Sequence, residues 1–308
     1  QERIEFKRYL TNIGLTYTWN EGKYKTHTLS ILDMNFAFIT KDSKILTTLS
    51  SLSPAQRFKF EDAISSGVKY NFLFNNQGNK KIKNPTYFVA KSWLIGTSAL
   101  VAKAFGFEER NPGSNAITLA KIRYATFFKL QGDLRKFLNF TNEQQIALRT
   151  FLGAGIPLDK HGVIPFDQLY FVGGANSIRG WRQRTLGQGS YLQPDDNVDK
   201  LGEIKIELNV EYRFPVTSII KGALFIDAGN VWTEKPDIDT EIYGRKNFDV
   251  NRFHKEFAVS PGIGVRLDFD FFLFRVDLGV PLKQAYTPSV WNLETNKTQL
   301  NFGVGYPF

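Results

Sequence analysis

The chain has 308 residues, with 15% aromatic and 22% charged residues, no cysteine and a formal net charge of +9. The lack of cysteine excludes disulfides and thiolate metal sites, and three scattered histidines do not suggest a metal cluster, so we expect no metal or cofactor. No run of about 20 apolar residues is present, which excludes a membrane-spanning helix. The charge admits nucleic acid, anionic lipid or an acidic surface as partner, but basic residues are spread along the chain, which argues against nucleic acid.

Alternation of apolar and polar residues predicts β-strands along the whole chain, because successive side chains of a strand point to opposite faces. In chain order, the expected strands are 13–19, about 28–40, 64–74, about 86–98, about 116–130, about 144–156, 202–214, about 219–232, 257–269, 272–280 and 300–308. The pattern is strictest in 202–214, where apolar residues from Ile204 to Phe214 hold the even positions. Five charged residues and Asn209 hold the odd ones.

The length of these strands favours a membrane protein. Many of the roughly eleven strands have 10 to 13 residues, whereas strands of soluble proteins usually have about five or six and tilted membrane-spanning strands about 9–11. We therefore predict an all-β fold, a transmembrane antiparallel β-barrel with its apolar face toward lipid and its polar face toward a wet lumen. A soluble sandwich or lipocalin-like barrel also alternates, but its apolar faces would have to share one core.

The connections between the predicted strands alternate in length. Those at 157–201, 233–256 and about 281–297 are long, whereas 215–218 and 270–271 are short. Outer-membrane barrels pair long external loops with short periplasmic turns, which predicts a periplasmic C-terminus. An odd set of eleven strands would leave open edges in lipid. We therefore expect the chain, which begins at Gln1 rather than Met, to be a processed or partial polypeptide that lacks N-terminal strands.

The connection 157–201 has an unusual composition for an exposed loop. It carries a central group of apolar and aromatic residues, Tyr170, Phe171, Val172, Ile178 and Trp181, and a cluster of glycines. Such a segment is expected to fold back into an enclosed space. The acidic residues of the next two strands (Glu203, Glu207, Glu211 and Asp227) offer carboxylates for its arginines Arg179, Arg182 and Arg184, because a guanidinium binds carboxylates bidentately.

Three motifs carry a resemblance to a known family. Residues 173–181 read GGANSIRGW, similar to a VRGF-type loop motif; residues 211–215 read EYRFP, similar to an E-x-x-x-P strand; and residues 225–232 read FIDAGNVW, matching F-x-D-x-G-x-V-W. In this order they resemble the BamA/TamA superfamily of outer-membrane protein assembly factors. The resemblance covers at least 144–308, and the loop variant is most similar to the TamA-like proteins (TamL) of Bacteroidetes.

The resemblance implies a 16-stranded barrel, of which residues 1–308 would supply the C-terminal eleven or so strands. N-terminal strands and periplasmic POTRA repeats would precede it, and the loop 157–201 would enter the lumen. Its motif would be Ile178, Arg179, Gly180 and Trp181, with Arg179 paired to Asp227 and to Glu211 as a second acceptor. Parity supports both acceptors, since Asp227 lies opposite Leu224, Ile226 and Trp232. The pair either locks the loop or takes part in gating.

The segment 300–308 resembles the recognition strand of outer-membrane proteins and would form one side of a lateral seam. Its signal residues are Leu300, Phe302, Gly303, Gly305, Tyr306 and Phe308, with Val304 continuing the alternation. Glycine and Pro307 would weaken the ladder where a seam must open, and client strands could add there by β-augmentation. An ordinary aromatic girdle at the membrane interface gives the same pattern.

We expect no enzymatic activity. Gly-x-Ser-x-Gly is absent, Ser177 has no neighbouring His, and an outer-membrane phospholipase would need a Ser/His pair. The predicted function is insertion or translocation of β-barrel or surface proteins. Expected partners are outer-membrane lipids, unfolded client outer-membrane proteins and periplasmic subunits (TamB-like or lipoproteins). A dedicated secretion pore or passive channel is the alternative, and a surface adhesin barrel is a weaker third.

Overall fold

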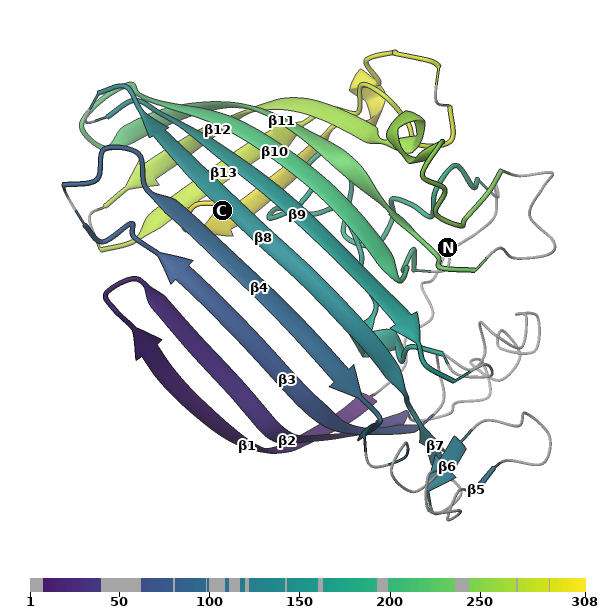
Figure 1. Ribbon diagram of the computed structural model, residues 1–308. Coiled ribbons are helices and arrows are strands. Elements are labelled where there is room, and N and C mark those ends of the chain that lie inside the picture. The colour runs from purple at the N-terminus through teal and green to yellow at the C-terminus, as the bar shows by residue number, and fades with distance from the viewer. Residues whose placement is uncertain are drawn as a thin grey trace. The chain divides into compact units, whose positions relative to one another are not determined.

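The computed structural model describes residues 8–39, 62–79, 81–97, 99, 109–110, 117–119, 122–141, 143–159, 163–192, 199–235, 244–269, 271–287 and 289–308. Within these ranges the chain is almost entirely β-structure, in a sheet of 14 strands (Figure 1). No helix in this part of the chain is long and apolar enough to cross a membrane. The chain divides into two compact units, one of 1–73, 90–131 and 154–169, the other of 74–89, 132–153 and 170–308.

Eleven of the described strands are six to fifteen residues long. They are β1 (Arg8–Glu21), β2 (Lys25–Ile39), β3 (Ala63–Asn75), β4 (Thr86–Ile95), β8 (Phe127–Asn139), β9 (Gln145–Pro157), β10 (Ile204–Pro215), β11 (Ile220–Trp232), β12 (Ala258–Asp268), β13 (Leu273–Gly279) and β14 (Gln299–Val304). Three short strands, β5 (Glu109–Arg110), β6 (Ile117–Leu119) and β7 (Ile122–Tyr124), and three 3-10 turns, Phe166–Gln168, Phe253–Glu256 and Thr295–Lys297, complete the described elements. The predicted all-β antiparallel fold is confirmed.

One predicted strand was misplaced. The range 116–130 holds the short strands β6 and β7, and the long strand begins only at Phe127 and runs to Asn139. The second half of β8 carries Asp133, Arg135 and Lys136, which obscured its alternation in the sequence. Asp133 is nevertheless buried and Leu134 exposed, so β8 follows the same pattern as its neighbours.

In the first unit, β1 and β2 form an antiparallel hairpin with a register shift at Leu15/Thr16. The turn between them contains Gly22 with a φ of +66°, a conformation that glycine adopts without strain. β2 also pairs with β3, and β3 pairs in parallel with the short β7. A small core of Ile64, Ala99, Ile117 and Tyr124 lies beside this pairing.

In the second unit, the strands follow one another in space as they do in the sequence, in the order β8-β9-β10-β11-β12-β13-β14 (Figure 1). The ladders from β10 to β14 are all antiparallel. Short turns join β10 to β11 and β12 to β13; in the first, Thr217 Oγ1 accepts hydrogen bonds from the backbone N–H groups of Ile219 and Ile220. The long connections lie at the opposite ends of these strands.

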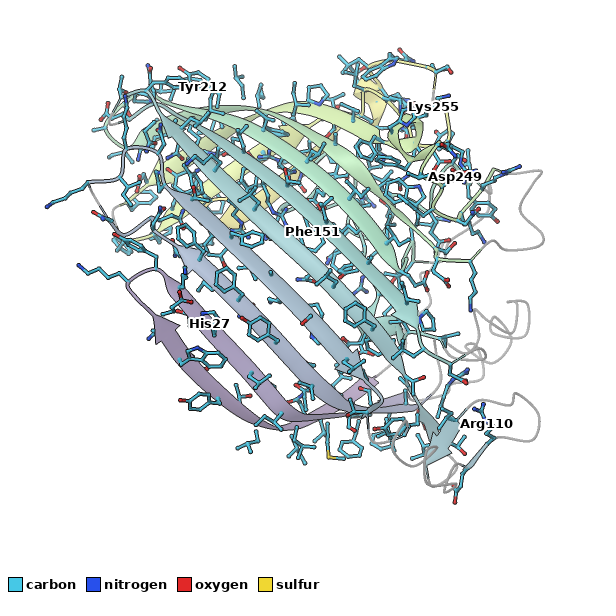
Figure 2. All side chains as sticks on the ribbon, viewed as in Figure 1. His27, Arg110, Phe151, Tyr212, Asp249 and Lys255 are labelled. Carbon is cyan, nitrogen blue, oxygen red and sulfur yellow. The ribbon has the colours of Figure 1, made fainter. Side chains whose placement is uncertain are left out.

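Side chains project from the strands to both sides of the sheet (Figure 2), and in this unit their burial is inverted relative to a soluble sheet. In β11, Leu224 and Ile226 are 50% and 54% exposed, whereas the next residue, Asp227, is completely buried. In β10 the charged residues Glu207, Glu211 and Arg213 are buried, and Leu208 and Val210 are exposed. An apolar exposed face opposite a buried charged face is the arrangement of a membrane-spanning β-sheet with a polar interior.

Trp232 departs from this alternation. Parity placed it on the same face as Leu224 and Ile226, but its side chain is completely buried. It lies under the 3-10 turn Phe253–Glu256, where its Nε1 donates a hydrogen bond of 2.7 Å to Glu256. The loop after β11 therefore covers the end of the strand, and Trp232 is buried although the alternation places it with two exposed residues.

Candidate functional site

The site is the described part of the connection between β9 and β10, which lies against the buried polar face of β10–β13. Its backbone is held by two isolated bridges, Tyr170 with Gly202 and Val172 with Leu186. Gly173 has a φ of +92°, and a Cβ there would lie 2.3 Å from the carbonyl oxygen of Arg182. Only glycine fits that close approach of two backbone segments.

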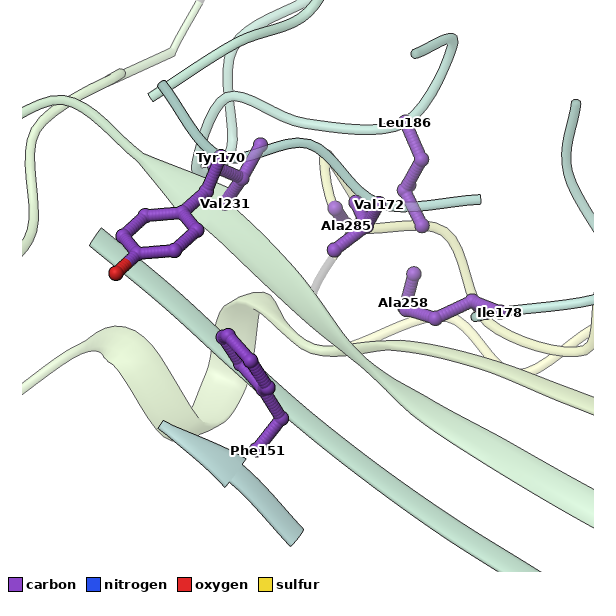
Figure 3. Close-up of a cluster of buried hydrophobic side chains, with 8 residues drawn as sticks. All are labelled: Phe151, Tyr170, Val172, Ile178, Leu186, Val231, Ala258 and Ala285. Atoms are coloured by element: carbon purple, nitrogen blue, oxygen red, sulfur yellow. The ribbon is translucent and has the colours of Figure 1, made fainter. Parts of the chain in front are cut away.

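The apolar residues of the loop form a buried cluster with the sheet (Figure 3). Its members are Phe151, Tyr170, Val172, Ile178, Leu186, Val231, Ala258 and Ala285, with Trp181 packed at the edge. Ile178 and Val172 are completely buried. This cluster supplies the hydrophobic anchor of a loop whose composition was unsuited to solvent, and it brings the motif residue Arg179 onto the charged face of the strands.

Arg179 is completely buried and bound on two sides. Its Nε and Nη2 donate to the two carboxylate oxygens of Asp227 at 2.8 and 2.9 Å, and its backbone N–H donates to the same group at 3.0 Å. Its Nη1 donates to Glu211 Oε2 at 2.5 Å. The guanidinium carbon also lies 3.3 Å from the centroid of the Phe225 ring, so the cation is held between two carboxylates and an aromatic face.

The register of the sheet explains why these groups meet. Asp227 stands opposite Asn209 on β10, and Glu211 stands opposite Phe225. Residues two apart on one strand share a face, so both carboxylates project to the side where the loop lies. Asn209 Nδ2 donates to Asp227 Oδ1 at 2.9 Å and fixes that carboxylate. The structure thus brings together all three residues of the predicted pairing.

Later strands extend the network. Arg266 of β12 donates to Glu211 at 3.1 Å and to Asp277 at 2.5 Å. Asp277 lies 3.6 Å from Arg179 Nη1 and also binds Arg275. In the sequence, Arg266 and Asp277 alternate with the apolar residues of the strands expected at 257–269 and 272–280, but the predicted partners of the loop did not include them. The burial of Arg179 acts to lower its pKa, but Asp227 and then Glu211 and Asp277 outweigh that effect and raise it, so the guanidinium stays charged.

A second polar contact fixes the loop two residues before Arg179. Ser177 Oγ donates to Glu207 Oε2 at 2.8 Å, and Glu207 also accepts from Arg149 of β9 at 2.6 Å. Asn209 Nδ2 donates to the backbone oxygen of Ser177 at 3.1 Å. Ser177 therefore anchors the loop to the sheet. The sequence analysis considered Ser177 only as a possible nucleophile and did not predict this structural role.

Gly180 and Trp181 complete the motif. The Gly180 N–H donates to Ser260 Oγ at 3.1 Å, and a Cβ on Gly180 would lie 2.5 Å from the Cβ of Ser260. On the other side, a Cβ on Gly279 would lie 2.5 Å from the backbone oxygen of Arg179. Trp181 Nε1 donates to Gln284 at 3.3 Å. The loop backbone thus passes so close to β12 and β13 that two glycines are required.

The last strand contacts the loop directly. Asn301 Nδ2 donates to the backbone oxygen of Arg179 at 2.9 Å, and Arg182 Nε donates to Gln299 Oε1 at 3.3 Å. Leu300 and Phe302 on the other face of β14 are exposed. Gly303 lies under the Arg275 guanidinium, which a Cβ would approach to 2.8 Å.

The alternation predicted for 300–308 fails at its end. β14 stops at Val304, Gly305 has a φ of +77°, and Phe308 is only 7% exposed. Tyr306 remains exposed, whereas Phe308 packs against Phe137 and Ala147 of β8 and β9. The positive φ of Gly305 redirects the chain from the sheet to the buried side, so Phe308 does not share the face of Phe302.

Comparison with known protein families shows the family to which the chain belongs. The model of the Omp85 superfamily domain matches residues 3–308, almost the whole chain. The chain belongs to the Omp85 superfamily. The outer membrane protein assembly factor BamA of Neisseria meningitidis serogroup B is 30% identical over 114 residues, which cover 32% of this chain and 14% of that protein. The predicted BamA/TamA membership is confirmed; the assignment to TamL of Bacteroidetes stays a prediction.

Solved structures of other proteins share the fold. BamA from Haemophilus ducreyi lacking POTRA domains 1–3 superposes with a TM-score of 0.63 at 16% identity, over 96% of this chain and 54% of that one. CdiB from Escherichia coli gives 0.56 at 10% identity, over 97% and 48%. The chain therefore spans about half the length of these structures. Its family and fold are those of outer-membrane β-barrel proteins.

Proposed function

We propose that this Omp85 chain is the barrel portion of an outer-membrane assembly factor that helps insert or translocate β-barrel and surface proteins. The observation that carries the proposal is the Arg179 seat, that is, the ion pairs of Arg179 with Asp227 and Glu211. A loop from the β9–β10 connection is fixed by Asp227 and Glu211 to the charged side of a sheet whose other side is apolar and exposed. Client folding, rather than nucleotide hydrolysis, would supply the driving force.

The Arg179 seat is in a position to influence the pairing of β14 with β13. β14 forms six residue pairs with β13, against twelve between β10 and β11. A short ladder opens more readily than a long one, and an opened strand edge can accept a client strand by β-augmentation. Because Asn301 of β14 binds the backbone oxygen of Arg179, the position of the loop and the pairing of β14 would be coupled. This favours a role in gating over simple locking.

The short turns after β8, β10 and β12 and the end of β14 would face the periplasm, and the long connections the exterior. The exposed apolar face would contact outer-membrane lipids. Unfolded client barrels and periplasmic subunits, such as TamB-like proteins or lipoproteins, would be the partners, and no chemical step would be catalysed.

An insertion assay tests this proposal. The full chain is reconstituted into phospholipid vesicles, and two unrelated β-barrels are diluted from urea onto them while their heat-resistant folded bands are followed on gels. Faster folding of both clients than in empty vesicles is expected. Acceleration of neither client would contradict the proposal.

A dedicated secretion pore or passive channel is the second candidate, supported by the similarity of the fold to CdiB. Planar-bilayer conductance separates the two. A pore would conduct steadily and act on one cognate substrate, whereas an assembly factor closed by the seated loop would conduct little and accept unrelated clients.

A further inference from the structure

A cavity of about 790 Å³ lies at the short-turn end of the second unit. Its lining comes from the β3–β4 connection (Gln77, Asn79, Lys81, Ile82, Lys83 and Pro85), from the end of β8 and the start of β9 (Phe137, Asn139, Phe140, Thr141 and Gln145), and from Arg213, Tyr306 and Phe308. Neither Arg179 nor Asp227 lines it, although Arg213 shares the carboxylate of Glu211 with Arg179. Its volume is in the range of binding sites for small molecules and peptides.

All charged side chains that line this cavity are basic. Lys81, Lys83 and Arg213 line it, and none of its lining residues is acidic. Lys81 and Lys83 are exposed and have no ion-pair partner among the described residues. Arg213 is buried and binds Glu211 at 2.8 Å. The two lysines are therefore the cations available to a ligand, which must carry negative charge to complement them.

The turn that carries the lysines is firmly built. Lys136 Nζ donates to the backbone oxygen of Asn84 at 2.7 Å, and the Asn139 N–H donates to Asn84 Oδ1 at 3.0 Å. The backbone N–H of Thr86 is bound by Asn76 Oδ1 at 2.6 Å. These contacts hold the turn on β8, so the lysines are presented from a fixed backbone and a ligand would lose little free energy to ordering of the site.

The other walls are aromatic and amide groups. Phe137 and Phe308 are buried beside the cavity, and the Arg213 guanidinium lies 4.1 Å from the Tyr306 ring centroid. Arg213 also donates to the backbone oxygen of Phe308 at 3.1 Å and to Gln145 Oε1 at 2.9 Å. Aromatic surface accommodates apolar side chains, and amide side chains both donate and accept, as a peptide backbone does.

The position of the cavity favours a peptide over a lipid headgroup. Arg213 and Phe137 belong to the buried face of their strands, whereas their neighbour Val210 and the other exposed apolar residues lie on the opposite, lipid-facing side. A lipid phosphate would approach that outer side. A polypeptide segment can enter from the short-turn end, where Lys81 and Lys83 stand.

We propose that this cavity binds an acidic peptide segment with interspersed apolar or aromatic side chains, supplied by a periplasmic partner. Its acidic groups would pair with Lys81 and Lys83, and its apolar side chains would pack on Phe137 and Phe308. The identity of the partner as periplasmic rests on the proposed function; the ligand chemistry rests on the cavity alone.

Binding of a defined peptide tests the proposal. The full chain in phosphatidylcholine nanodiscs is titrated into a fluorescein-labelled octapeptide of alternating Glu and Phe, with alternating Lys and Phe as the reference peptide, and anisotropy is recorded. The acidic peptide is expected to bind and the basic one not. Lys81→Glu with Lys83→Glu should weaken binding about tenfold or more. Lys23→Glu with Lys235→Glu, two exposed sites with the same change in net charge, should leave it unchanged.

Four outcomes overturn the proposal: no binding of the acidic peptide, equal binding of both peptides, equal effects of the two double variants, or displacement of the acidic peptide by short-chain phosphatidylglycerol. The last would assign the cavity to lipid headgroups. The heat-shifted gel band verifies that each variant is folded. The insertion assay on the wild-type chain separates the two proposals, because insertion without peptide binding removes only the cavity assignment.

Discussion

Replacing Asp227 with Asn is expected to lower the free energy of unfolding by about 3–5 kcal/mol, the usual cost of removing one partner from a buried ion pair. Asn keeps the size of the side chain, so the loss comes from the charge. Arg179 would retain Glu211 but lose the bidentate carboxylate that also binds its backbone N–H. Urea titration of the folded chain in lipid vesicles measures the change.

Arg179→Ala and the double variant Arg179→Ala/Asp227→Asn complete a double-mutant cycle with Asp227→Asn. Because each single change leaves a buried charge without its main partner, the double variant should lose less than the sum, with a coupling free energy of about 1–3 kcal/mol. Asp199→Asn is the matched control, since Asp199 pairs with the partly exposed Arg184 of the same loop and should cost less than about 1 kcal/mol. Strictly additive losses at 179 and 227 would show that the two residues do not act as a pair.

Gly279→Ala is expected to displace the loop without removing any charged group. The new Cβ would lie 2.5 Å from the backbone oxygen of Arg179 and 2.8 Å from the nitrogen of Gly180. Both are backbone atoms that no side-chain rotation can move, so the loop must shift away from β13. Overpacking typically costs about 1–3 kcal/mol, and we expect the upper part of that range in urea titration, together with faster proteolysis within 163–192.

Gly78→Ala serves as the control for this change, because no atom lies within 4 Å of its Cβ position. It should alter neither stability nor the rate of proteolysis. A Gly279→Ala chain as stable and as protease-resistant as the control would mean that the loop is not seated against β13.

The sequence predicted the strands best where one face is strictly charged. The strand expected at 202–214 is β10 almost to the residue, because five charged residues and Asn209 alternate with apolar residues without interruption. The strand from Phe127 to Asn139 was displaced in the prediction, since Gly132 and the adjacent Arg135 and Lys136 break the visible period. Local patterns therefore located strands only as precisely as the alternation was regular.

The site was predictable only in part. Motif and parity indicated Arg179, Asp227 and Glu211, because two neighbouring strands fix which residues share a face. Asp277 and Arg266 join the same network through strands 50 or so residues later in the chain, and no local pattern specifies which polar side chains of one face touch. Phe308 was misplaced for a similar reason, since its burial depends on Gly305 and on packing with Phe137 far away in the sequence.

The site and its proposed function both depend on which face of the sheet meets lipid. The chain has no cysteine, so a nitroxide can be attached to single cysteines at Val210 and Leu224, which are 45% and 50% exposed, and at Val250 in a loop, which is 70% exposed. In vesicles, labels at 210 and 224 should collide mainly with oxygen and the label at 250 mainly with a water-soluble nickel complex. Equal accessibility of all three labels to nickel would contradict a membrane-spanning sheet.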